Sequence, residues 1–337
     1  MCDIEMTRGI LARRLGLCLA LGTFLWGISA RGYWIRRHSQ RTAISRHMRC
    51  ADNPALRSPI LVSYAYYEKE PVLQHHLVRD TQTQIEGVSE IWRKGGVVML
   101  KRVKNEGMDF AAHNVTIQWT HTTGRQKLYN TYFFINSSVR GPFFPSYMGQ
   151  AWQWTQAFTE RMDDDVRVVA SSLVCLPGMD AGGYGPKVES WAFAVDLVAL
   201  KLLIEAGVFN SRVCKLCDDG IVVKGEYGIS NTILNAGYNI ATLMSMYPVG
   251  VDWRDESHWH CNNNTHPSRR GTYDGISMHP FETVFLKASW HVGEPYTSHY
   301  TRWNLARATG DSNTAGTFDE SQYYYAISKL AEEPEHV

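Results

Sequence analysis

Lys101-Arg-Val-Lys-Asn105-Glu-Gly-Met-Asp109-Phe110 is followed along the chain by Tyr132-Phe-Phe-Ile-Asn136-Ser-Ser138-Val-Arg140-Gly-Pro, and these two motifs decide the fold. The first motif comes after residues 96–100, whose apolar run is typical of a buried strand, and it opens a helical pattern. The second is an apolar run of strand length that stops abruptly in short polar side chains. Open α/β sheets place their ligands where strands end in such loops. The stretch therefore predicts a strand, a helix and a second strand with a ligand site at its end.

The rest of the chain continues this alternation of strands and helices. Strand patterns cover residues 59–66, 166–174 and 238–244, and helical patterns cover 72–92, 191–206 and 227–236. We expect Ser190 to cap the helix over 191–206 and Gly207 to end it. Residues 250–275 are rich in Asp, Asn, His, Arg and Gly, which predicts a long loop of the kind that often carries function. The alternation indicates an α/β fold with a parallel or mixed sheet covered by helices.

The composition fits a globular protein with one large α/β domain or two small ones. The chain has 337 residues, of which 44% are hydrophobic. No internal repeat and no Pro/Gly/Ser-rich linker divides it, so we predict one domain over residues 58–300, between an N-terminal segment (1–50) and a C-terminal tail (301–337). The main domain is acidic, because only 25 of the basic residues but 31 of the acidic ones follow residue 49. This charge argues against a nucleic-acid partner, which would need clustered Lys and Arg.

The N-terminal segment carries an uncharged apolar run at residues 15–30, between Arg13-Arg14 and Arg31. Its length is below the roughly 20 residues of a full bilayer span, yet it suits a thin membrane or a signal-peptide core. The first interpretation is a single-pass signal anchor. The basic residues after the run outnumber those before it, which by the positive-inside rule favours the opposite orientation. A cleavable signal peptide and an organelle transit peptide stay open as alternatives.

The cysteines leave two interpretations open. Cys214-Lys-Leu-Cys217, with His258-Trp-His260-Cys261 further along, has the types of side chain that bind zinc. A single Cys-x-x-Cys pair, with the other residues in an irregular loop, favours a local disulfide or packing thiols over a metal site. A zinc-dependent hydrolase built on residues 258–266 is the corresponding functional alternative.

Several elements in this order resemble nucleotide-diphospho-sugar transferases of the GT-A fold. These are the Asn105-x-Gly-x-Asp109 motif, the strand that ends at Asn136-Ser-Ser138, and the later Glu226 followed by a helix and Gly237-Tyr238. The likeness covers most of the chain after residue 58. It is strongest to the rhamnan-synthesis type and its relatives in algae, fungi and bacteria. The resemblance implies a Rossmann-like, mixed and mainly parallel sheet flanked by helices, and transfer of a sugar from a nucleotide donor to a glycan or other hydroxyl acceptor.

The resemblance places the catalytic base at Glu226. An inverting transfer needs a carboxylate that takes the proton of the acceptor hydroxyl as it attacks the anomeric carbon, and groups that stabilise the departing diphosphate. Glu226 stands at a predicted helix start, where the family's Glu-Asp motif places its base. The alternative is a first-turn Glu that stabilises the helix dipole by about 0.3 to 1 kcal/mol.

The resemblance assigns the donor to the two opening motifs. Asn105 and Asp109 match positions near the nucleoside, although they could also be a turn and a helix cap. Asn136 and Ser138 fall where many relatives carry Asp-x-Asp, the pair that binds Mn²⁺ or Mg²⁺. No carboxylate is present here, which puts a divalent metal in doubt, because hard cations prefer carboxylate oxygens. Arg140 is the nearest basic residue that could neutralise the diphosphate instead.

Three further residues are candidates for contact with the acceptor or the diphosphate. Glu189 precedes a predicted helix in the region that faces the acceptor in relatives, Asp219 lies just ahead of Glu226, and His279 opens a short helical pattern. Each also has a structural interpretation as a helix-start carboxylate, a turn residue or a hydrogen-bonding His. Trp253 and Trp259, in the polar loop, could stack on an acceptor sugar.

Together these patterns predict a membrane-anchored, single-domain glycosyltransferase that transfers a hexosyl or deoxyhexosyl group, with a location in the Golgi or endoplasmic reticulum. Its expected partners are a nucleotide sugar, a glycan acceptor and a membrane that holds residues 15–30. The rival hypothesis is a non-catalytic glycan-binding protein that retains the GT-A fold. An organelle-targeted or secreted protein follows if the leader is cleaved.

Overall fold

The computed structural model describes residues 59–65, 106–145, 147–148, 152–269, 271–287, 296–297 and 299–301. The chain divides into two compact units, Met1–Pro54 and Ala55–Val337, and every described residue belongs to the second. The predicted leader at 15–30, the helix over 72–92, the strand over 96–100, Asn105 and the tail beyond 301 lie outside the described residues. Within the described ranges, no helix is long and apolar enough to cross a membrane.

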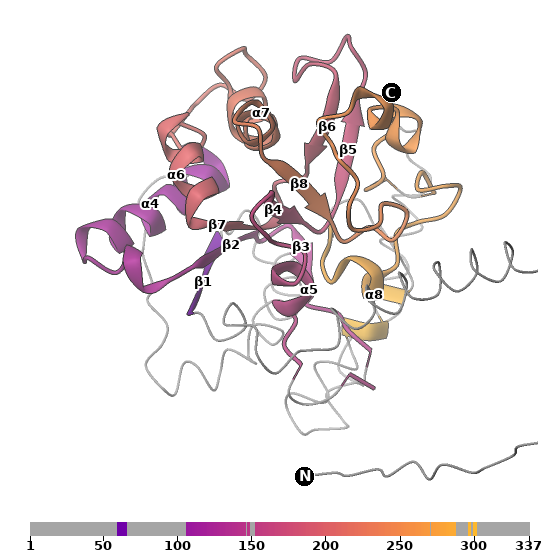
Figure 1. Cartoon of the computed structure of the whole chain (residues 1–337), viewed down its shortest axis with the longest axis horizontal. Coiled ribbons are helices and arrows are strands. Elements are labelled where there is room, and N and C mark those ends of the chain that lie inside the picture. Colours follow the sequence, from indigo (N-terminus) through magenta and orange to yellow (C-terminus); the bar gives the residue numbers. More distant parts are fainter. Residues whose placement is uncertain are drawn as a thin grey trace, which may run out of the picture. The chain divides into compact units, whose positions relative to one another are not determined.

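A five-stranded mixed sheet forms the centre of this unit (Figure 1). Its strands, in spatial order, are β1 (Ile60–Ala65), β2 (Thr131–Asn136), β7 (Ala192–Asp196), β4 (Val166–Ala170) and β8 (Asn239–Thr242). β1 pairs parallel to β2 and β4 pairs parallel to β8, while β7 runs antiparallel to both of its neighbours. Four strands therefore share one direction, which confirms the predicted mixed and mainly parallel sheet.

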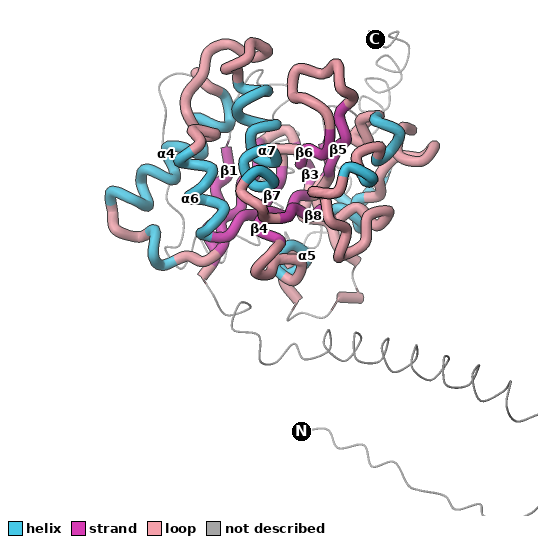
Figure 2. The backbone as a smooth tube through the Cα atoms, turned by 45° about the horizontal axis from the view of Figure 1, so that its top comes forward, coloured by secondary structure: helices cyan, strands magenta, loops and turns pink. Residues whose placement is uncertain are grey.

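Successive side chains of a strand point to opposite faces of the sheet. Both faces of this sheet carry apolar side chains, and helices cover both of them. Tyr132 and Phe134 of β2 pack in one core with buried side chains of three helices: α4 (Met108–Thr122), α6 (Leu197–Glu205) and α7 (Tyr227–Asn235). Phe133, between them, packs edge to face on Phe158 of α5 (Gln156–Thr159) with ring centroids 5.3 Å apart. Figures 1 and 2 show α5 on the opposite side of the strands from α6 and α7.

Two short ribbons and several single turns complete the unit. β5 (Leu173–Leu176) pairs with β6 (Gly185–Val188), and β3 (Val139–Arg140) pairs with β9 (Leu286–Lys287), both antiparallel. α8 (Pro280–Thr283) precedes β9, and a π-helical segment, η4 (Ile221–Glu226), leads directly into α7. The 3-10 turns are η3 (Gln126–Leu128), η5 (Glu256–His258) and η6 (Cys261–Asn264).

Two predicted elements are corrected by the structure. The helix predicted over residues 191–206 is strand β7 followed by α6, and Asp196 rather than Ser190 caps α6, by accepting the Ala199 N–H at 2.8 Å. A strand buried on both faces is an uninterrupted apolar run, which periodicity cannot distinguish from a buried helix. The strand predicted over residues 166–174 is β4 and the start of β5, because the chain leaves the central sheet after Ala170 and pairs with β6.

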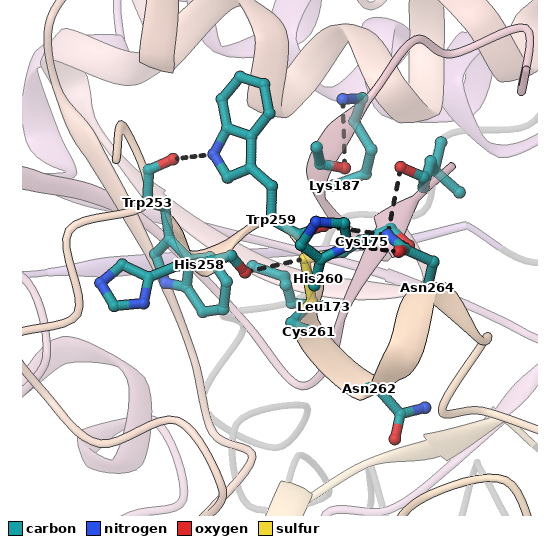
Figure 3. Close-up of a disulfide and its surroundings, with 12 residues drawn as sticks. Leu173, Cys175, Lys187, Trp253, His258, Trp259, His260, Cys261, Asn262 and Asn264 are labelled. Atoms are coloured by element: carbon teal, nitrogen blue, oxygen red, sulfur yellow. Dashed lines mark hydrogen bonds between the residues drawn. A yellow bond between two sulfur atoms is a disulfide. The ribbon is translucent and has the colours of Figure 1, made fainter. Parts of the chain in front are cut away.

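The long polar loop is held in place by a disulfide and by asparagines. Cys175 of β5 is bonded to Cys261, with their Cα atoms 5.4 Å apart (Figure 3). Asn262, Asn263 and Asn264 have left-handed backbones, a conformation that Asn tolerates better than most residues. The Asn264 side-chain amide donates to the carbonyl oxygens of Cys175 and Trp259, at 3.3 and 3.0 Å. The loop is therefore anchored to β5 at Cys261 and Asn264.

The cysteines of the suggested zinc site form disulfides, which argues against zinc binding at that site. Cys214 and Cys217 form a local disulfide, as the sequence favoured, and Cys261 is bonded to Cys175. The thiolates needed for the suggested zinc site are thus used in covalent bonds. Among the residues that the structure describes, no group of three or more His, Cys, Asp or Glu side chains is placed to hold a metal ion.

Candidate active site

The two opening motifs meet at the carboxyl end of β2. Asn136 is the last residue of β2, and Asp109 lies in the first turn of α4. The Nδ2 of Asn136 donates to Oδ2 of Asp109 at 2.9 Å. Its Oδ1 accepts the backbone N–H of Ser138 at 3.1 Å and also the Ser138 hydroxyl. This network fixes the Asn136 amide and the Asp109 carboxylate side by side at the strand end.

Glu226 is brought to the same place by the segment that precedes α7. It is the last residue of η4 and the N-cap of α7, and its side chain is partly buried. Gly225 lies against the aromatic ring of Phe110, where an added Cβ would be 3.3 Å from two ring atoms. Phe110 follows Asp109 and Gly225 precedes Glu226, so this contact places the start of α4 against the end of η4.

Burial and neighbouring charge give Glu226 the properties of a proton carrier. Burial raises the pKa of Glu226, and the negative charges of Asp109 and Glu189 raise it further, to about 7. Lys287 and Lys215 act in the opposite direction. A carboxyl group with a pKa near the working pH is well suited to general acid–base chemistry. Strongly perturbed carboxylates with specific charge partners are typical of functional sites.

Glu189 is buried and has several partners within the protein. Its buried carboxylate accepts hydrogen bonds from the hydroxyls of Ser172 and Ser268, and His266 Nδ1 lies 3.3 Å from its Oε1. Burial alone would raise the pKa of Glu189, but the hydrogen bond and charge of His266 and the two hydroxyls outweigh it and lower the pKa to about 2. Glu189 is therefore a fixed negative charge that ties the polar loop to the β5–β6 ribbon.

Two lysines act on Glu226 in addition to the predicted Arg140, whose role stays a prediction. Arg140, in β3, is only 9% exposed. Lys287, on the paired strand β9, is partly exposed, and its positive charge lowers the pKa of Glu226. Lys215, in the exposed Cys-Lys-Leu-Cys turn, also lowers the pKa of Glu226 through its positive charge. Neither lysine is predicted by a sequence pattern. Lys287 follows an apolar run and Lys215 lies between two cysteines, so neither pattern signals a link to a carboxylate far along the chain.

Asp219 and His279 have local structural partners. Asp219 is exposed, and its Oδ1 lies 3.4 Å from Nε of Arg212. His279 caps α8: its Nδ1 accepts the Phe281 N–H at 3.2 Å, and its ring packs on Phe281 and Tyr300. Burial lowers the pKa of His279, against the charge of Glu282. Both residues therefore have local partners, and contact with the acceptor or the diphosphate stays a prediction for each.

The two tryptophans of the polar loop differ in exposure. Trp253 is 2% exposed and packs in the core, which corrects its suggested role as a sugar platform. Trp259 is partly exposed, and its Nε1 donates to the Trp253 carbonyl oxygen at 2.9 Å (Figure 3). Its ring lies against Gly185, where a Cβ would be 2.8 Å away, and beside Tyr184. Trp259 is thus the one of the pair with surface available to a ligand.

Comparisons with known proteins give little further guidance. No family model matches the sequence, and no curated protein matches it. Among solved structures, the chain is similar to the crystal structure of a glycosyltransferase involved in the glycosylation of the major capsid of PBCV-1, with 13% identity and a TM-score of 0.23. The match covers 44% of this chain and 64% of that one, so this chain spans less than two thirds of that protein. A similarity at this level carries no argument about function.

Proposed function

We propose that this protein is a glycosyltransferase of the GT-A type that uses a nucleotide-sugar donor and inverts the anomeric carbon, with Glu226 as general base. One arrangement carries the proposal: the hydrogen-bonded Asp109–Asn136 pair lies at the end of a sheet strand, near enough to the partly buried Glu226 carboxyl group for the charge of Asp109 to raise its pKa. Ligands of open α/β sheets bind at such strand ends. The expected substrates are a nucleoside-diphosphate hexose or deoxyhexose and a glycan or other hydroxyl acceptor.

Each group then has a chemical role. Ionised Glu226 takes the proton of the acceptor hydroxyl, whose oxygen attacks the anomeric carbon as the bond to the diphosphate breaks. Asp109 and Asn136 offer a carboxylate and an amide for hydrogen bonds to the ribose or base of the donor. Lys287 and Lys215 supply positive charge near Glu226 for the departing diphosphate.

A divalent metal does not fit the donor loop. Asn136 Oδ1 already accepts two hydrogen bonds from Ser138, and the loop offers hydroxyls where a metal site would need carboxylates. No step is assigned to a metal here.

The disulfides support the expected compartment. Cys175–Cys261 and Cys214–Cys217 are bonds that form and persist in oxidising environments such as the endoplasmic reticulum lumen. We therefore retain the secretory pathway as the proposed location, and anchoring through residues 15–30 stays a prediction.

The test is release of nucleoside diphosphate from a panel of nucleotide sugars by wild type and Glu226→Gln. We expect kcat to fall by about 100- to 10,000-fold, the usual contribution of a general base. The matched control is Glu205→Gln, because Glu205 is an exposed carboxylate at the end of α6. Equal turnover by Glu226→Gln and wild type would show that the base is wrong. Glycan binding by a wild type that turns over no donor would favour the non-catalytic alternative.

A further inference from the structure

A disulfide-closed turn stands directly before the segment that carries Glu226. Cys214 and Cys217 are bonded, and both are exposed. The apolar side chains of the turn are also exposed: Val213 by 87% and Leu216 by 70%. Burial of apolar surface therefore contributes little to holding this turn, and the cross-link is a principal constraint on its shape.

The backbone of this turn accepts the hydrogen bonds that begin η4. The N–H groups of Gly220, Ile221 and Val222 donate to the carbonyl oxygens of Cys217, Cys214 and Lys215, at 2.6, 3.0 and 3.0 Å. The first N–H groups of a helical segment have no partner within that segment and must find one elsewhere. Here the Cys214–Cys217 turn supplies these partners, and η4 then ends at Glu226.

Close packing makes the contact between the turn and η4 sensitive to shape. A Cβ at Gly220 would lie 2.6 Å from the Lys215 carbonyl oxygen and 2.7 Å from that of Cys217. The other side of the turn is fixed to the end of α6, because Nη2 of Arg212 donates to the Gly207 carbonyl oxygen at 2.7 Å. The Cys214–Cys217 turn is thus hydrogen-bonded to the end of α6 on one side and to η4 on the other. We therefore expect that opening the disulfide changes the position of η4.

We propose that the Cys214–Cys217 disulfide is a redox-sensitive positioning element, which keeps Glu226 in place when oxidised and releases η4 when reduced by a dithiol. This inference rests on the proposed function for its effect on activity, but not for its effect on η4. Exposed disulfides are the ones most accessible to thiol exchange. The second disulfide offers an internal contrast, because Cys175 is fully buried and Cys261 is 7% exposed.

The reduction is an ordinary thiol–disulfide exchange. A thiolate of the dithiol attacks one cysteine sulfur, the Cys214–Cys217 bond breaks, and the other cysteine leaves as a thiolate that takes a proton. The second thiol of the reductant then displaces the first cysteine and closes its own disulfide. Two electrons pass from the reductant to the protein, which ends with two thiols.

The first test measures structure, without reference to activity. The full chain is treated with graded dithiothreitol, alkylated thiols are mapped by mass spectrometry, and hydrogen exchange is followed in peptides that cover residues 220–226. We expect Cys214 and Cys217 to be alkylated at lower reductant concentration than Cys175 and Cys261. The amides of Ile221 and Val222 should then exchange about tenfold faster or more, while those of β4 and β7 keep their rates. Unchanged exchange in η4, or free thiols at Cys214 and Cys217 in the untreated protein, would overturn the inference.

The second test measures the consequence for turnover. Reduced wild type and a Cys214→Ser/Cys217→Ser variant should share a kcat about tenfold or more below that of the oxidised protein, with a smaller change in the KM for the donor, because Glu226 and Lys215 are displaced while the Asp109–Asn136 pair is not. The variant should no longer respond to the reductant. A variant with wild-type kcat and wild-type exchange in η4 would contradict the proposal. If η4 responds to reduction but no donor is turned over by any form, the proposed function fails and the positioning element stands.

Discussion

Gly225 lies against the ring of Phe110, so closely that a Cβ on residue 225 would be 3.3 Å from Cδ2 and Cε2 of that ring. Gly225 directly precedes Glu226 in the sequence, and Phe110 directly follows Asp109; Glu226 and Asp109 are the two acidic residues of the proposed site. The contact joins the start of α4 to the end of η4, and it is the packing that converts two separate motifs into one site.

Replacing Gly225 by Ala should impair catalysis more than folding. The added methyl must displace Phe110 by a few tenths of an ångström and so alter the separation of Asp109 and Glu226. Relief of glycine's entropic cost in a helical segment, about 0.5 to 1 kcal/mol, offsets part of the packing strain. We expect kcat to fall about tenfold and Tm to change by less than about 4 °C.

The matched control for this substitution is Gly178→Ala, because nothing lies within 4 Å of a Cβ at that position. It should leave both kcat and Tm close to wild type. A Gly225→Ala protein with full activity would show that the Phe110 contact does not set the geometry of the site.

The raised pKa of Glu226 predicts a specific dependence of stability on pH. Because its pKa is about 7 in the folded protein and about 4.5 in the unfolded chain, the folded state holds the proton more tightly. The stabilisation is present below pH 4.5 and is lost as the pH rises through 7. At 1.36 kcal/mol per pKa unit, the ionised group costs at most about 3 kcal/mol at pH 8.

Glu226→Gln should therefore be as stable as wild type at pH 4.5 and more stable at pH 8, by up to about 3 kcal/mol. Urea unfolding at the two values of pH measures this difference. A stability difference that stays the same at both values would contradict the raised pKa.

Glu189 predicts the opposite dependence. Its pKa is lowered to about 2, so its contribution to stability is present above pH 4.5 and is lost as the pH falls through 2. Glu189→Gln should lower the free energy of unfolding by about 3 kcal/mol at pH 7, because a buried carboxylate with three partners is removed. The difference from wild type should shrink when unfolding is measured at pH 3.

Ser268→Ala is a graded comparison, since it removes one hydroxyl donor and leaves His266 and Ser172 in place. We expect a loss of about 1 to 2 kcal/mol at pH 7. A larger loss for Ser268→Ala than for Glu189→Gln would contradict the central role of the carboxylate.

Asn136→Asp should move the pH dependence of turnover. The substitution removes the amide that donates to Asp109 and adds a negative charge close to both acids. Because nearby negative charge raises the pKa of a carboxyl group, the rising limb of kcat should move from near pH 7 to higher pH. Asn136→Ala removes the amide without adding a charge. It should weaken donor binding by about tenfold in Kd, and it should leave the rising limb of the kcat profile near pH 7. An identical pH profile for both variants would exclude this electrostatic account.

Local patterns predicted most of the elements that build the sheet, but not the central strand β7. The runs that became β1, β2 and β8, and the helices α4 and α7, were identified because their residues carry period and end signals within a short window. The same windows could not separate β7 from α6, since Trp191 through Leu203 is apolar almost throughout and only Asp196 marks the boundary. Likewise, β5 was not separated from β4, because the turn between them consists of two buried serines.

The candidate site residues follow from a family resemblance, and their roles stay predictions. The structure joins Asp109 to Asn136 by a hydrogen bond, and the charge of Asp109 raises the pKa of Glu226. Asp219 and His279 have local partners, Arg212 and the Phe281 N–H. Lys215 and Lys287 were missed because a charge that acts through space leaves no pattern in sequence.

The sequence by itself determined the alternation of strands and helices and the polar ending of β2, because these features depend on residues a few positions apart. Only the tertiary structure decided that the charge of Asp109 acts on Glu226, that Glu189 is held by Ser172, Ser268 and His266, and that Cys175 pairs with Cys261. These relationships join segments far apart along the chain. They arise from packing, such as that of Gly225 on Phe110, and packing depends on the whole fold.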